Sequence, residues 1–277
     1  MALDEYSPRI NKVQFISKII LSLIYSNVFI SLGAAFSYFA LGALLEKETN
    51  FSMAIFNFGI TFSYYNLCQC IGIKGLEFQN MSPLQKFVAK NMTEILFFNF
   101  FLLVFCLYCF FSFQLYAQYL FIILLSFIAF FYFYYNDIIH KTRILKPLII
   151  ATAWALLPFF TLQINLCDID LNYFSMITLY IFLLSIVYDQ KDRDPNSFIH
   201  AFGNTISRAV VIVLHLIIIA LFINKVHDYS IWGIGLFFLV SNCVLLYGIH
   251  KKEELWHLTF TDGLIHFSSL LLILNSK

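Results

Sequence analysis

The sequence has few charged residues for its length. Only 12% of its 277 residues are Lys, Arg, Asp or Glu, and the formal net charge is +1. A soluble domain has about a quarter of its residues charged, so a soluble protein of this composition would have too little charged surface to stay dispersed. The small net charge gives no electrostatic field that indicates a nucleic-acid partner. Ten Gly and five Pro are too few for a collagen-like chain or a proline-rich disordered one.

The six cysteines form no complete metal-binding motif. Cys68 and Cys70 are close together, but no histidine or second cysteine pair completes a zinc pattern around them. The other four lie in or beside apolar runs, where a thiol behaves as a small buried hydrophobe; they are Cys106, Cys109, Cys167 and Cys243. The cysteines therefore predict packing rather than metal or redox chemistry.

Apolar residues dominate the chain and occur in long, nearly continuous stretches. The sequence is 61% hydrophobic, with 34 Phe and 16 Tyr, and its mean hydropathy is +0.81. A membrane β-barrel would instead show alternating segments of about ten residues. A spanning helix needs about 20 mostly apolar residues. The sequence therefore predicts one all-α, polytopic membrane domain over residues 1–277, with nine transmembrane helices at about 15–44, 51–72, 94–113, 117–135, 146–164, 171–188, 208–224, 229–249 and 258–274.

The basic residues predict how these nine segments are oriented. If the segments alternate across the membrane, 14 of the 17 Lys and Arg residues fall on one side, and only Lys47, Lys225 and Lys277 fall on the other. Basic residues gather on the cytoplasmic side of membrane proteins. We therefore expect a cytoplasmic N-terminus, an external C-terminus, and a place in an inner (plasma) membrane of bacterial type. The longest connections, at about 73–93 and 189–207, are then both cytoplasmic, and long loops on one face often hold functional residues.

The connection after the sixth predicted helix contains two acidic residues three positions apart. Asp189 and Asp192 would share one face if that helix runs one turn beyond the membrane. Two carboxylates with water can hold Mg²⁺, which completes its ligand shell with substrate phosphates. A solvated loop, in which these acids pair with neighbouring Lys or Arg residues, is the alternative. Pro195 disfavours helix at the residue before it, so the shared face ends there.

Several polar residues fall inside predicted spans and need partners there. Asn66 and Gln69 lie on one face near the end of the second span, and Asn27 lies within the first. Hydrogen bonds between helices explain such residues as readily as a binding role does. Ionisable groups inside a membrane are functional candidates by default, and Asp262 and His266 fall in the ninth predicted span and His215 inside the seventh. A structural hydrogen bond is an equal alternative for Asp262.

The order and spacing of these segments resemble the UbiA superfamily of intramembrane prenyltransferases. Tyr25-Ser26-Asn27 resembles the early asparagine segment of that family, and Tyr65-Asn66 resembles the start of its first motif, N-D-x-x-D-x-x-x-D. Asp189 to Asn196 resembles the second motif, D-x-x-D-x-x-x-D, and His200 to Arg208 resembles the segment that follows it. Lys146 to Pro158 is similar to the fifth helix of some bacterial members, and Asp262-Gly263 to a pair in the last helix. The likeness covers essentially the whole chain.

The sequence departs from both motifs. The three carboxylate positions of the first motif are Leu67, Cys70 and Lys74, and Asn196 replaces the last carboxylate of the second. In the family the two motifs resemble the halves of a clamp that holds Mg²⁺ on an isoprenyl diphosphate. The changes in the first motif alter the local charge by about four units, so we expect that half of the clamp to hold no metal. Lys74 could instead meet a phosphate as a point charge.

The resemblance implies a prenyltransferase that moves an isoprenyl group from an isoprenyl diphosphate to an aromatic or other lipid-soluble acceptor. Asp189 and Asp192 would then hold Mg²⁺, with Asn66, Lys74, Asn196 and Arg208 as diphosphate contacts. The fold implied is a UbiA-like bundle with a cavity open to the cytoplasm. A non-catalytic member that binds a lipid or a partner helix is the alternative that the lost carboxylates favour. A transporter is a minor alternative, because few charged residues lie deep in the spans and no inverted repeat is evident. No soluble partner is implied.

Overall fold

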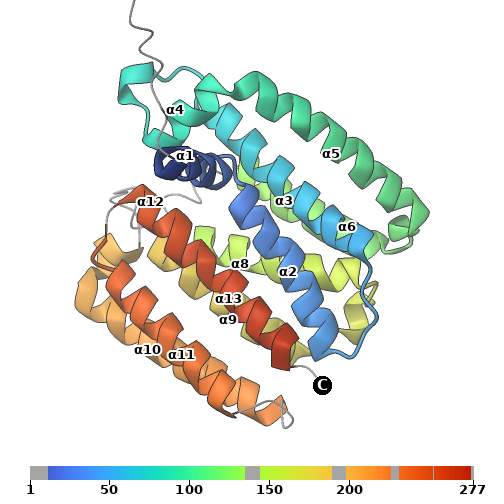
Figure 1. The fold of residues 1–277 in the computed structure, drawn as a ribbon. Helices are drawn as coiled ribbons and strands as arrows, with labels where there is room; N and C mark the ends of the chain where they lie inside the picture. Colours follow the sequence, from blue (N-terminus) through green and yellow to red (C-terminus); the bar gives the residue numbers. More distant parts are fainter. Residues whose placement is uncertain (1–11, 135–143, 189–197, 226–230, 252, 276–277) are drawn as a thin grey trace, which may run out of the picture.

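The computed structural model describes residues 12–134, 144–188, 198–225, 231–251 and 253–275. These residues are predominantly helical and contain no β-strand, which confirms the predicted all-α class. The helices are shown in Figure 1. They are α1 (Lys12–Tyr25), α2 (Val28–Leu44), α3 (Phe51–Gly72), α4 (Pro83–Lys90), α5 (Met92–Ser112), α6 (Tyr119–Tyr134), α8 (Leu145–Thr161), α9 (Leu171–Tyr188), α10 (Phe198–Lys225), α11 (Ile231–Gly248), α12 (Glu254–Trp256) and α13 (Asp262–Asn275).

Each of the nine predicted segments contains a helix, and several of these helices have the length and apolarity of membrane spans. Among the described residues, four helical stretches meet both criteria: Met92–Ser112, Leu171–Tyr188, Phe202–Ile223 and Glu254–Leu274. The pair α1 and α2 makes a fifth if the two helices are counted together. Helix α3 is long enough but less apolar, because it contains Asn57, Asn66 and Gln69. The chain is thus an all-helical protein with helices suited to a membrane.

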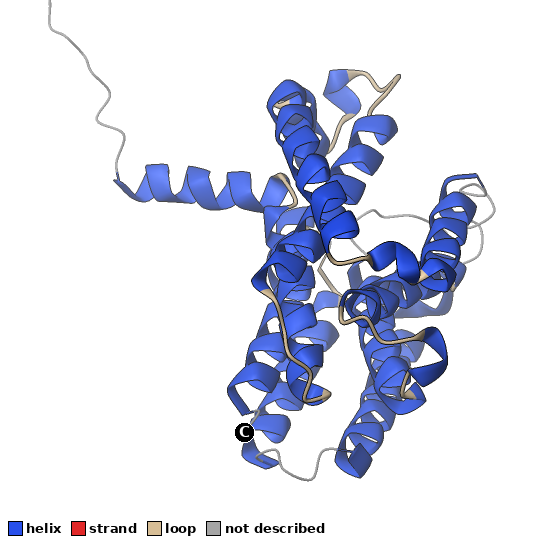
Figure 2. Ribbon diagram, turned by 90° about the vertical axis from the view of Figure 1, so that its right-hand side faces the viewer, coloured by secondary structure: helices blue, strands red, loops and turns tan. Residues whose placement is uncertain are grey.

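The first predicted span is not one helix, which corrects the prediction for residues 15–44. The chain breaks at Ser26 and Asn27, and α1 and α2 meet there at an angle of 67°. Asn27 has a φ of 63°, a left-handed conformation that ends a helix and that asparagine adopts more readily than most residues. Figure 2 shows α1 leaving the bundle sideways, nearly at right angles to the long helices. The apolar run therefore hides a sharp bend that hydropathy alone does not reveal.

The helices that begin and end the bundle pack directly on each other. Helix α2 lies between α3 and α13, and α8 and α9 form another closely packed pair (Figure 1). Gly33 of α2 allows this approach, because a Cβ at that position would lie only 3.1 Å from the Cγ2 of Ile265 in α13. This arrangement brings α2, α3, α8, α9 and α13 around one interior space, so residues far apart in the sequence can line a common cavity.

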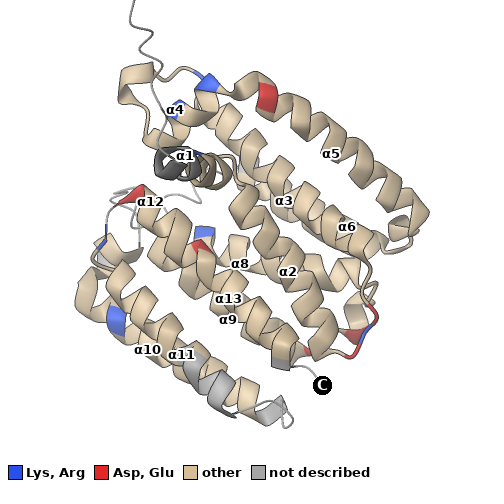
Figure 3. Cartoon of the chain, viewed as in Figure 1, with Lys and Arg blue, Asp and Glu red and all other residues tan. Residues whose placement is uncertain are grey.

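The outer surface of the bundle is apolar where helices face away from it. On α5, Phe97, Phe100, Leu107 and Phe111 are each more than half exposed. A soluble monomer rarely exposes a contiguous apolar surface of this kind, whereas lipid contact accounts for it. Among the described residues the charged side chains are sparse and lie mostly towards helix ends and connections (Figure 3). Both features agree with an integral membrane protein.

Candidate functional site

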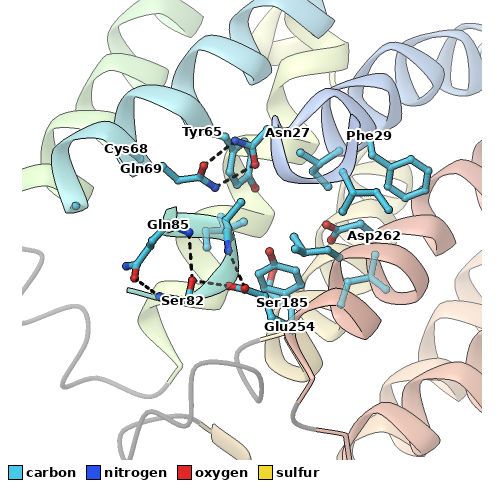
Figure 4. Close-up of a pocket in the computed structure, with 18 of the residues that line it drawn as sticks. Asn27, Phe29, Tyr65, Cys68, Gln69, Ser82, Gln85, Ser185, Glu254 and Asp262 are labelled. Atoms are coloured by element: carbon cyan, nitrogen blue, oxygen red, sulfur yellow. Dashed lines mark hydrogen bonds between the residues drawn. The ribbon is translucent and has the colours of Figure 1, made fainter. Parts of the chain in front are cut away.

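A cavity of about 990 Å³ lies among the helices that meet at the break between α1 and α2. Its described walls come from the end of α1, the start of α2, the second half of α3, the connection into α4, the start of α4, and parts of α6, α8, α9, α12 and α13. Figure 4 shows polar groups on two sides of this space, with Asn27, Tyr65 and Gln69 on one and Ser82, Ser185 and Glu254 on the other. Apolar side chains such as Ile24, Ile150, Ile181 and Leu184 complete the lining. The cavity can therefore receive a molecule with both polar and apolar parts.

Three side-chain amides hold the helix break together at the edge of this cavity. The Nδ2 of Asn27 donates to Oδ1 of Asn66 at 3.0 Å and to Oε1 of Gln69 at 3.0 Å. The Nε2 of Gln69 donates back to Oδ1 of Asn27 at 3.1 Å. Asn66 also donates to the backbone carbonyls of Ser26 at 3.1 Å and Phe62 at 2.9 Å. The amide network of Asn27, Asn66 and Gln69 thus satisfies the backbone where the helical pattern is interrupted.

Aromatic side chains form another part of the wall. The indole Nε1–H of Trp154, in the middle of α8, donates to the hydroxyl of Tyr65 at 3.2 Å. Tyr65, Trp154 and Tyr132 all line the cavity. The hydrogen bond fixes the orientation of both Tyr65 and Trp154 across an interhelical contact. These rings present flat apolar faces to any molecule bound there.

Three charged side chains line the cavity within the described part of the chain. Lys146 lies at the start of α8, Asp262 at the start of α13, and Glu254 at the start of α12. Asp262 is only 9% exposed, and Figure 4 shows its carboxylate directed into the space. Lys146 is the one cation among the described lining residues. Glu254 and Asp262 give the described lining one more carboxylate than ammonium group, so an anionic ligand would lie in the field of charges of both signs.

The short helix α4 covers one side of the cavity and is tied down by Glu254. Ser82 caps α4, because its hydroxyl accepts from the backbone N–H of Gln85 at 3.3 Å while the Gln85 side chain accepts from the Ser82 N–H at 2.9 Å. Oε1 of Glu254 accepts the Ser82 hydroxyl at 3.1 Å, and Oε2 accepts the Leu84 N–H at 3.1 Å. A carboxylate at a helix N-terminus also interacts favourably with the positive end of the helix dipole.

The charged residues next to Glu254 pair with each other, and Glu254 contacts α4. Lys251 pairs with Glu253 at 3.5 Å. The hydroxyl of Tyr247 and the carboxylate of Glu253 raise the pKa of the Lys251 ammonium, which therefore stays charged at neutral pH. The carboxylate of Glu254 is then the group that links the last helices to α4.

Replacing Glu254 by alanine should loosen α4. Loss of a helix cap costs about 0.5–2 kcal/mol, so the amides of α4 should exchange with deuterium about tenfold faster. Glu254→Gln keeps one acceptor oxygen and should have a smaller effect. Hydrogen–deuterium exchange followed by mass spectrometry in detergent measures this. Unchanged exchange in α4 would show that the capping box alone holds the helix.

The structure brings none of the three described diphosphate candidates into the cavity. Asn66 is fully buried beside the cavity and uses its amide in the network described above. Lys74 is exposed in the turn that follows α3. Arg208 is exposed on α10, where its guanidinium contacts the ring of His250. Neither Lys74 nor Arg208 is among the residues that line the cavity. Asn66 thus stabilises the lining residues Asn27 and Gln69 through the amide network and does not line the cavity itself.

The second predicted motif lies outside the described residues. Asp189, Asp192 and Asn196 all fall within 189–197. The last described residue before this segment is Tyr188, which ends α9 and lines the cavity. Asp189 is therefore one peptide bond away from a residue of the cavity wall.

The first-motif positions, on α3 and in the turn after it, do not suit Mg²⁺. Leu67, Cys70 and Lys74 supply no carboxylate oxygen, and hard oxygen ligands are what Mg²⁺ requires. Among the described residues, no three His, Cys, Asp or Glu side chains lie close enough together to hold a metal ion.

Sequence reasoning missed three residues of the cavity wall as site residues. Lys146 counted only towards the charge of a loop, although it begins the segment that resembles a family helix. Ser82 and Glu254 meet across about 170 residues of chain, which no local pattern predicts. The Ser82-Pro-Leu-Gln85 capping box was a readable signal for α4 itself.

Comparison with family models, curated proteins and solved structures gives no match to this chain.

Proposed function

We propose that this chain binds an isoprenyl diphosphate in the cavity and transfers the isoprenyl group to an aromatic or other lipid-soluble acceptor. Nine helices, the first reduced to α2, would cross the plasma membrane, with the cavity facing the cytoplasm. The observation that carries the proposal is the cavity of about 990 Å³, whose lining combines apolar side chains with a cation, Lys146, and includes Tyr188, the last described residue before the second motif. The resemblance to the UbiA superfamily supplies the substrate class.

The dimensions and lining of the cavity support an amphiphilic ligand. Sites for small molecules and cofactors occupy about 300–1,000 Å³, and this cavity is at the upper end of that range. A flexible isoprenyl chain needs such a volume and an apolar wall, while a diphosphate needs hydrogen-bond donors and positive charge. Lys146, Ser82 and Gln69 are polar groups at the same space. The lining thus matches both ends of the proposed donor.

In the proposed reaction the allylic C–O bond breaks and the electron pair leaves with pyrophosphate. A new bond forms between the allylic carbon and the acceptor, which loses a proton. Pyrophosphate is a poor leaving group unless its growing negative charge is neutralised. Mg²⁺ held by Asp189 and Asp192 would neutralise most of this negative charge. Lys146 of the cavity wall would stabilise the anionic headgroup, and Asn196 would complete the second motif.

A non-catalytic protein that binds a lipid in the same cavity is the second candidate. The observation that favours it is the loss of the first carboxylate motif, whose positions are Leu67 and Cys70 on α3 and Lys74 in the turn after it. With one half of the clamp missing, a diphosphate could bind without being cleaved. The two candidates share the ligand and differ in whether Mg²⁺ and turnover follow.

Thermal unfolding of the detergent-purified protein tests the shared part of both candidates. Farnesyl diphosphate with Mg²⁺, at about 100 times its Kd, should stabilise the folded state by about 2.7 kcal/mol and raise Tm by about 5–10 °C. Lys146→Met should weaken this binding by about tenfold or more, because it removes a charge-assisted contact. Lys90→Met is the matched control, since Lys90 is exposed on α4 and does not line the cavity.

Uncharged farnesol and inorganic pyrophosphate separate the contributions of tail and headgroup. If farnesol alone gives the whole shift, the cavity binds a neutral lipid and the diphosphate proposal is wrong. If no isoprenyl diphosphate of any chain length changes Tm, both candidates are wrong.

A further inference from the structure

Helix α1 is too short to cross a membrane and does not continue into α2. Its 14 residues extend about 21 Å, less than the roughly 30 Å of a bilayer core. It leaves α2 at 67° and projects sideways from the bundle (Figure 2). The left-handed backbone of Asn27 and the amide network of Asn27, Asn66 and Gln69 fix this direction. The bend is thus built from specific hydrogen bonds.

The exposed residues of α1 separate into an apolar side and a polar side. Ile19, Ile20 and Leu23 are 45%, 51% and 45% exposed. Lys18 is also exposed. At 3.6 residues per turn, Lys18 is roughly opposite Ile20 and Leu23. Over residues 18–25, whose side chains are described, three large aliphatic side chains therefore share one outward face and Lys18 lies on the other side.

Contacts with α4 show which side of α1 faces the cytoplasm. The ring of Tyr25, on the same side of α1 as Lys18, lies 5.9 Å from that of Phe87 in α4. Helix α4 belongs to the long connection that the basic residues place in the cytoplasm, and it contains Lys86 and Lys90. The polar side of α1 thus faces the cytoplasmic connection, and the apolar side faces away from it.

We propose that α1 lies in the plane of the cytoplasmic membrane surface, with Ile19, Ile20 and Leu23 in the lipid and Lys18 at the headgroups. Helices with one aliphatic face and one basic face bind in this way. The occupant of the exposed apolar face is then the lipid of the surrounding leaflet. The orientation that α4 gives to the polar side, the lateral projection of α1 and the charge of Lys18 all agree with it.

This arrangement sets the depth of the cavity in the membrane. Ile24, near the end of α1, and Asn27, at the break, both line the cavity. If α1 lies at the headgroup level, this edge of the cavity lies at that level too. An amphiphile from the cytoplasmic leaflet could then enter without bringing its charged headgroup across the bilayer core. The inference needs the membrane location of the chain and its predicted orientation, but not the proposed transfer activity.

Site-directed spin labelling in lipid nanodiscs tests the position of α1. Single cysteines would replace Lys18, Ile19, Ile20 and Leu23 in turn. The background carries Cys68→Ala, Cys167→Ser and Cys243→Ser; the other three thiols are buried, and this background without an introduced cysteine should take up no label. Collisions with oxygen report lipid exposure, and collisions with a water-soluble nickel chelate report water exposure.

We expect labels at 19, 20 and 23 to collide with oxygen and the label at 18 to collide with nickel. Labels 20 and 23 should lie at about the same depth, because a helix in the interface has no net change of depth along its axis. A steady change of about 1.5 Å per residue would show that α1 spans the membrane and would overturn the proposal. Labels at 20 and 23 that meet nickel would place the face in water. Labels that meet neither collider would place it against protein, such as a second copy, and either outcome overturns the proposal.

Discussion

Replacing Asp189 and Asp192 together by asparagine should abolish isoprenyl transfer and remove the part of the ligand-induced rise in Tm that depends on Mg²⁺. Asparagine keeps the size of each side chain but removes the negative charge that attracts a divalent cation. Without the cation, the charge that grows on pyrophosphate is no longer neutralised, and we expect transfer to fall by about 10³-fold. Transfer is measured with radiolabelled isoprenyl diphosphate and a panel of lipid-soluble acceptors, and Tm by intrinsic fluorescence.

The same segment supplies a matched control. Asp194 lies between the second-motif positions but does not belong to the D-x-x-D-x-x-x-D spacing. Asp194→Asn should therefore leave both Mg²⁺ dependence and transfer unchanged. If the double variant keeps the full Mg²⁺-dependent rise in Tm, these two carboxylates do not hold the metal. If the diphosphate raises the Tm of the wild-type protein equally with and without Mg²⁺, the non-catalytic candidate is favoured.

The helices could be predicted closely from the sequence, because length and apolarity determine them. The predicted range 51–72 coincides with α3 (Phe51–Gly72), and 171–188 with α9 (Leu171–Tyr188). The break within 15–44 could not be predicted in this way. It depends on hydrogen bonds that Ser26 and Asn27 make with Asn66 and Gln69, about 40 residues further along the chain. A hydropathy window averages over such a contact and sees only an uninterrupted apolar run.

The candidate site was harder to predict than the fold. Asn66 was weighed as a diphosphate contact and as a partner between helices, and its three hydrogen bonds are all made to neighbouring protein atoms. Lys146 and Glu254 reach the cavity because α8 and α12 happen to begin there. That placement follows from how the helices pack, which a single sequence does not encode in any local pattern. The roles of Asp189 and Asp192 stay predictions.

Replacing Asn66 by leucine should destabilise the protein even though the number and branching of the side-chain heavy atoms stay the same. The substitution removes an acceptor from Asn27 and leaves the buried carbonyl of Ser26 without its side-chain donor. Leaving buried polar groups unpaired costs about 1–3 kcal/mol, equivalent to a fall in Tm of about 2–10 °C. Because the amide network also fixes the bend, a spin label at position 20 of α1 should become more mobile in this variant. Thermal unfolding and the spectrum of that label measure the two effects.

The same substitution elsewhere in the bundle should have the opposite sign. Asn99 on α5 is only 2% exposed, yet neither its Nδ2 nor its Oδ1 has a hydrogen-bond partner in the described structure. Replacing a buried polar group that makes no hydrogen bonds removes a desolvation cost, so Asn99→Leu should leave Tm unchanged or raise it. Equal destabilisation by both substitutions would mean that packing, and not the network, explains the effect at position 66. A fall confined to Asn66→Leu, together with a mobile label on α1, would show that hydrogen bonds from α3 hold α1 away from the axis of α2.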